Sequence, residues 1–194
     1  MKLITCLLLS IAVLTGCSGG KEQILTPSNT SFDAQTSEAP ATTTDKPAAL
    51  LDIKKLVQAT QELSDQAEEV AEILGKPVKT ENGEWTLFGS GAKKPFVRHY
   101  YELAIGTVSV MYIEGAIAHI TVEFTEELKY PGDETKAMER LGLVESDFYQ
   151  KIAEEPAYSR FVLSSFYYAD VLKGKPDKPN VIRGIKVVTD EVYE

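Results

Sequence analysis

The chain has 194 residues, of which 29 are Asp or Glu and 20 are Lys or Arg, so its net charge is −9 at neutral pH. This acidic balance excludes the basic footprint that nucleic-acid binding requires, and we expect no nucleic-acid partner. The length allows one ordinary domain beyond any targeting segment, and the content of large apolar residues suffices for a core.

The N-terminal residues have the layout of a bacterial secretion signal. Lys2 supplies a short positive region, and the apolar stretch from Leu3 to Leu14 is shorter than the ~20 residues that cross a bilayer. It closes on Leu14-Thr15-Gly16-Cys17, which resembles the lipobox of bacterial lipoproteins. The resemblance implies that residues 1–16 are a lipoprotein signal peptide and that the thiol of Cys17 receives the lipid.

A lipid on Cys17 predicts a protein anchored to the cell membrane and facing outward into the cell envelope. Two or three acyl chains hold a protein stably, whereas one chain binds only marginally. Ser18 follows the cysteine, where an Asp would favour retention at the inner membrane, so we expect the cell outer membrane if the host has two membranes. Cys6 leaves with the signal, so the mature domain contains no disulfide and no thiolate nucleophile.

Residues 17–48 read as the lipidated cysteine followed by a disordered tether. The segment is rich in Ser, Thr, Pro and Ala and has few large apolar residues, so it cannot bury enough surface to order itself. A coil of ~30 residues has a root-mean-square reach of ~30 Å. Residues 49–194 then form the predicted globular α+β domain.

The segment 53–74 has apolar residues at alternating spacings of three and four, which predicts an amphipathic helix. Gly75 and Pro77 end it. A single helix of this length would be ~35 Å long, and Asp65 with Glu68 fits a capping box. One helix and two helices separated near Ser64 therefore stay open as alternatives.

An antiparallel meander follows. Asn82-Gly83 is a turn signal, and three β-rich runs between 97 and 124 are separated by the short turns at Gly106 and Gly115. Two further helices are predicted, one over 134–141 and one that begins after Ser146 and ends before Pro156. Six segments are predicted as strands: 84–88, 97–104, 107–113, 116–124, 160–172 and 181–188.

These elements predict an α+β fold in which a meander of about five or six antiparallel strands carries helices packed on one face. The two halves of the predicted domain also share a sequence pattern. Leu74-Gly75 and Leu141-Gly142 each end a predicted helix, and strands with the same apolar spacing follow both. A duplicated α-β-β unit is one interpretation of this repeated pattern.

A small-lipoprotein pattern is also present. It consists of Leu63-Ser64, Val70-x-x-x-Leu74-Gly75-x-Pro77, Trp85 and Tyr112-x-x-Gly115-x-Ile117. This pattern resembles the BamE-like (SmpA/OmlA-type) domains, and the resemblance implies two helices on a three-stranded sheet. Members known to act do so by binding other proteins, such as assembly machinery in the outer membrane. It supplies no matched binding residue.

Two readings of the activity follow. The first is a non-catalytic protein-binding or adaptor module with an envelope protein as its partner and no cofactor. The second is a small-ligand protein, a metal-binding protein or an enzyme that uses His99, His119 and Glu123, since two histidines and a carboxylate can hold a metal. The aromatic group of the C-terminal half serves either as core or as a binding patch; it comprises Phe148, Tyr149, Tyr158, Phe161, Phe166, Tyr167 and Tyr168.

Overall fold

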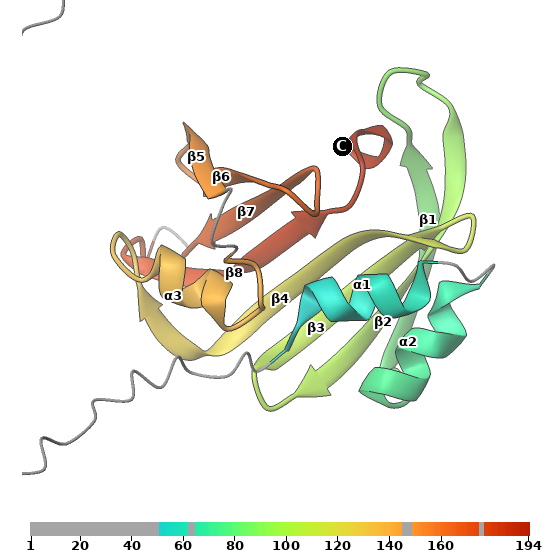
Figure 1. The fold of residues 1–194 in the computed structure, drawn as a ribbon, viewed down its shortest axis with the longest axis horizontal. Helices are drawn as coiled ribbons and strands as arrows, with labels where there is room; N and C mark the ends of the chain where they lie inside the picture. Colours follow the sequence, from blue (N-terminus) through green and yellow to red (C-terminus); the bar gives the residue numbers. More distant parts are fainter. Residues whose placement is uncertain (1–50, 62–64, 145–148, 175–176) are drawn as a thin grey trace, which may run out of the picture. The chain divides into compact units, whose positions relative to one another are not determined.

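The computed structural model describes residues 51–61, 65–144, 149–174 and 177–194, so the predictions for 1–48, including Cys17, lie outside it. Its main feature is one antiparallel sheet with the strand order β1-β2-β3-β4-β8-β7-β6-β5 (Figure 1). The strands are β1 (Lys79–Thr86), β2 (Lys93–Leu103), β3 (Gly106–Ile113), β4 (Ala116–Lys129), β5 (Tyr149–Glu154), β6 (Tyr158–Leu163), β7 (Tyr168–Lys173) and β8 (Val181–Val188). The described helical elements are α1 (Ile53–Thr60), α2 (Gln66–Leu74), α3 (Glu134–Glu139) and the 3-10 turn η1 (Glu191–Tyr193).

The prediction of five or six strands with helices packed on one face is wrong. The sheet has eight strands, and helices of 8, 9 and 6 residues are too short to form a layer across it. The α-β-β repeat is wrong as well, because each half of the sheet is a run of four consecutive strands, β1 to β4 and β5 to β8.

The missing strands lie in the C-terminal half. The helix expected after Ser146 is strand β5 over its described residues, where Tyr149 stacks on Phe161 of β6 with ring centroids 5.3 Å apart. Pairing with β6 therefore overrides the local helical pattern. The single strand expected over 160–172 is two strands, because the chain turns between Leu163 and Tyr168.

Several N-terminal predictions are confirmed. The segment 53–74 forms two helices, and the Asp65 carboxylate caps the second by accepting a 3.0 Å hydrogen bond from the amide of Ala67. The meander over 97–124 is also confirmed. The turn predicted at Asn82-Gly83 is wrong: Gly83 lies inside β1, where an added Cβ would lie 2.6 Å from the ring of Phe96. That glycine lies against a neighbouring aromatic ring inside a strand rather than in a turn.

The hydrophobic core lies on one face of the sheet. Alternate side chains of the central strands, such as Val110, Ile120 and Ile185, are fully buried there. The helices add Ile53 and Met138 to the same cluster. Each such side chain contributes about 1.5–3 kcal/mol when it is fully buried.

The two four-stranded runs meet where β4 pairs with β8. Thr121 lies opposite Lys186 and Val122 lies opposite Ile185. Gly184 permits this approach, because a Cβ at that position would overlap the backbone carbonyl of Val122. The sheet is therefore continuous only because position 184 has no side chain.

This junction predicts that Gly184→Ala lowers the free energy of unfolding by about 2–4 kcal/mol, because a backbone carbonyl in a ladder cannot move aside. Gly83→Ala is the matched control, since its added Cβ meets only a phenyl ring that can rotate; we expect a loss of about 1 kcal/mol or less. Urea unfolding followed by circular dichroism measures both variants. Equal losses would contradict this account of the junction.

Candidate functional site

The structure does not support the hypothesis of a site made of His99, His119 and Glu123, because it places these residues apart. His99 on β2 lies opposite Val110, whereas its neighbour Arg98 lies opposite Met111, which in turn faces His119 on β4. Because side chains alternate between the faces of a sheet, the two histidines lie on opposite faces.

Glu123 shares a face with His119 but lies four residues further along β4, a separation of about 13 Å between Cα atoms. The structure therefore does not bring the three predicted residues together. Over the described ranges, no group of three or more His, Cys, Asp or Glu side chains is placed to hold a metal ion.

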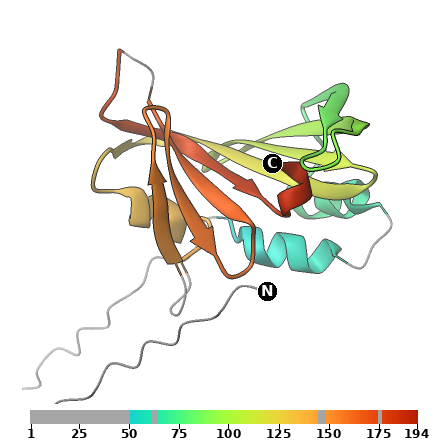
Figure 2. The ribbon, with the colours of Figure 1, turned by 90° about the horizontal axis from the view of Figure 1, so that it is seen from above.

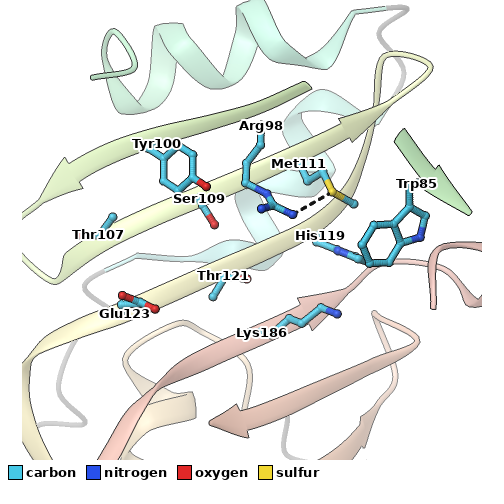
Figure 3. A pocket seen from close by; sticks show the side chains of 10 residues that line it. All are labelled: Trp85, Arg98, Tyr100, Thr107, Ser109, Met111, His119, Thr121, Glu123 and Lys186. Carbon is cyan, nitrogen blue, oxygen red and sulfur yellow. Dashed lines mark hydrogen bonds between the residues drawn. The ribbon is translucent and has the colours of Figure 1, made fainter. Parts of the chain in front are cut away.

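The face of the sheet opposite the core carries a different constellation, which we call the polar face. Its side chains come from β1, β2, β3, β4 and β8 and then continue onto β7 and β6. It comprises Trp85, Arg98, Tyr100, Thr107, Ser109, Met111, His119, Thr121, Glu123 and Lys186 (Figure 3), together with Asp170, Tyr168, Arg160 and Tyr158.

The first ten of these residues line a hollow of about 360 Å³. The strand register explains it. Ser109 and Thr121 are direct cross-strand neighbours, and they lie between Tyr100 on one side and Lys186 on the other. Short side chains in the middle of a row and long ones at its ends leave a depression, whose volume falls in the range of small-ligand sites.

The row continues past Lys186 into an ion cluster. Arg160 binds Asp170 in a bidentate manner, with distances of 2.8 and 3.0 Å, and also binds the carboxylate of Glu194 at 2.8 Å. Its guanidinium lies 3.5 Å from the centroid of Tyr168. The bond to Asp170, more than any other contact, raises the pKa of Arg160 above its ordinary value. This part of the polar face thus holds one guanidinium between two carboxylates.

His119 is the buried histidine of this face. The side chain is 4% exposed. Its Nε2 lies 2.7 Å from the carbonyl of Tyr193, and since a carbonyl only accepts, Nε2 carries the proton. The Trp85 ring packs edge-on against the imidazole at 4.8 Å. Burial, followed by the nearby charge of Lys186, lowers the pKa of His119 to about 4.

The C-terminal segment holds this histidine in place. The carbonyl of Val192 accepts a 2.9 Å hydrogen bond from the amide of Phe88, so η1 lies beside the end of β1 (Figure 2). Tyr193 also packs against a small cluster that contains Met111.

The sequence left open whether the aromatic group of the C-terminal half belongs to the core or to a binding patch, and its members divide between the core and the polar face. Phe161 and Phe166 are buried in the core, whereas Tyr168 is buried on the polar face. Tyr158 is half-buried and lies on the polar face, where the Arg160 guanidinium is 5.2 Å from its ring centroid. Phe148 lies outside the described residues.

Sequence reasoning missed Arg98 and Lys186, because nothing local indicates that β8 lies beside β4. A partial signal was present: His119, Thr121 and Glu123 were expected on one face of their strand, and Thr107, Ser109 and Met111 follow the same alternation on β3.

No family model matches the chain, and no curated protein or solved structure proved similar to it. The resemblance to BamE-like domains stays a prediction. Among the described helices, none is long and apolar enough to span a membrane.

His119 predicts an acid-sensitive fold. Because its folded-state pKa of about 4 lies below the ordinary value of 6.5, the unfolded chain binds more protons between these values. Stability therefore falls as the pH is lowered from 6.5 towards 4, by up to roughly 3 kcal/mol. We expect His119→Gln to flatten this part of the profile of urea midpoint against pH.

The control is His99→Gln, because His99 is only half-buried; burial lowers its pKa as well, but most of the acid loss should remain. The carboxylates contribute equally to the pH profiles of the variants and of the unmodified chain, so the difference between two profiles reports on the histidine alone. A His119→Gln profile as steep as that of the unmodified chain would show that this histidine is not the buried neutral group described.

Proposed function

We propose that the protein is a lipid-anchored, non-catalytic component of the bacterial cell envelope that binds another envelope protein through its polar face. The anchor is proposed from the sequence Leu14-Thr15-Gly16-Cys17, which lies outside the described residues. The location that follows is the outward side of the cell membrane, or the outer membrane in a host with two membranes. The segment up to residue 48 gives the domain reach.

One observation carries the binding proposal: large aromatic and arginine side chains gather on the sheet face opposite the main hydrophobic core, beside a smaller apolar cluster that contains Met111. Trp85, Tyr100 and Tyr158 are half-buried on that face, next to Arg98 and Arg160. Tyr, Trp and Arg are the residues enriched at the centres of protein interfaces.

The geometry supports the same use. Arg160 is fixed by two carboxylates, and the Tyr100 hydroxyl donates a 2.6 Å hydrogen bond to Glu81. Side chains that are held in place before binding lose less conformational entropy on contact with a partner. The polar face therefore offers a pre-organised surface rather than a set of mobile side chains.

The anchor predicts that Cys17→Ser abolishes incorporation of labelled fatty acid and moves the protein out of the membrane fraction, because the lipid is its only proposed attachment. Cys6→Ser is the matched control and should change neither result, since the thiol of Cys6 leaves with the signal. Fatty-acid labelling and cell fractionation measure both. Membrane retention of unlabelled Cys17→Ser would remove the anchor from the proposal.

If the polar face binds a partner, crosslinking in intact cells should depend on the position of the crosslinker. A photoreactive amino acid at Tyr100 or Tyr158 should give a discrete crosslinked band, whereas the same group at Glu72, an exposed position on α2, should not. Mass spectrometry of the band identifies the partner. Equal crosslinking from Glu72, or none from the polar face, would contradict this assignment of the surface.

A further inference from the structure

The hollow on the polar face contains two cations whose charges are poorly compensated. Arg98 is the first. Its Nη2 donates to the Met111 sulfur at 3.3 Å, which is a weak acceptor, and its Nη1 lies 3.9 Å from Glu81. The same Glu81 oxygen accepts the Tyr100 hydroxyl at 2.6 Å. The carboxylate is thus oriented to the tyrosine, and among the described residues the Arg98 guanidinium has no hydrogen bond to a carboxylate.

Lys186 is the second cation. Within the part of the chain that the structure describes, no acceptor bonds to its ammonium group, which lies 5.9 Å from the centroid of the Trp85 ring. The carboxylate beside it in the sheet, Asp170, accepts a bidentate bond from Arg160, so its charge is shared between the two cations. Burial lowers the pKa of Lys186; the charges of Asp170 and Glu194 oppose this shift, and those of Arg160 and Arg98 add to it.

The rest of the hollow suits an anionic group. Ser109 and Thr121 place hydroxyl donors between the two cations, and Glu123, the carboxylate at the far end, faces Arg183 at 3.8 Å. Half-buried positive charge that lacks a close ion pair is costly, and a bound anion relieves that cost.

We propose that the hollow binds a carboxylate from an acidic segment of the partner protein, held between Arg98 and Lys186 over the Ser109 and Thr121 hydroxyls. This inference rests on the proposed protein-binding role of the polar face. A protein carboxylate fits better than a free anion because the walls include the half-buried rings of Trp85 and Tyr100, which offer apolar contact to the segment that carries the charge (Figure 3). The net charge of −9 opposes non-specific attraction of acidic ligands, so any binding must come from this local arrangement.

The test uses the full-length chain in a neutral detergent at low salt and a short, capped poly-glutamate peptide as the probe. Trp85 is the only tryptophan of the chain, so its fluorescence reports on the hollow directly. The labelled methyl of Met111 gives a second signal, and Met138, fully buried in the core, is the internal control. We expect poly-glutamate to shift Trp85 and Met111 but not Met138, and a poly-glutamine peptide of the same length to shift none of them.

Variants test the named residues. Lys186→Gln should weaken poly-glutamate binding by roughly tenfold or more, the loss expected for a hydrogen bond to a charged group. Lys186→Arg should retain binding. Lys93→Gln removes one positive charge at an exposed position of β2 and should leave the affinity within about twofold. Thermal melts establish that each variant is folded.

Each outcome decides the inference. Binding of poly-glutamate that depends on Lys186 supports it. Absence of any shift, or equal weakening by Lys93→Gln, overturns it. Inorganic phosphate forms a separate arm: a response to phosphate without one to poly-glutamate assigns the hollow to free anions and also overturns the proposal. Because this experiment needs no partner, its failure is distinct from a failure of the crosslinking experiment.

Discussion

The structure depends on the pairing of β4 with β8. Each half of the sheet is a simple run of four strands whose turns are local, but the contact between the halves brings together residues more than 60 positions apart, such as Thr121 and Lys186. Gly184 makes this contact possible by leaving room for the carbonyl of Val122. Without this pairing, each run would have a long unpaired edge, which soluble sheets avoid.

The same pairing gives the two faces different roles. On one face it joins Val122 to Ile185 and completes the core. On the other face it places Lys186 beside Thr121. A cation from β8 therefore lines the hollow together with side chains of β2, β3 and β4. Arg160 and Asp170 compensate each other, whereas Lys186 does not find such a partner within the described residues. We propose that the ammonium group of Lys186 serves binding for this reason.

Local features were predictable from the sequence, and non-local ones were not. The alternation of His119, Thr121 and Glu123 and the glycine turns were enough for the central meander, whereas the capping pattern at Asp65 left one helix and two helices open, and the structure has two. Strand β5 was missed because its residues also suit a helix, and only pairing with β6 decides between the two. The hollow was missed because strand order and register between distant segments leave no local pattern. For the same reason, the sequence did not show that His99 and His119 lie on opposite faces of the sheet.

The central claim is that β4 and β8 are neighbours in the register that places Thr121 opposite Lys186. The most direct test is nuclear Overhauser spectroscopy of the labelled full-length chain. We predict backbone contacts between Thr121 and Lys186 and between Glu123 and Gly184. Contacts from β4 to a strand other than β3 and β8, or a register shifted by one residue, would contradict the account, because Lys186 would then leave the hollow for another place or for the opposite face.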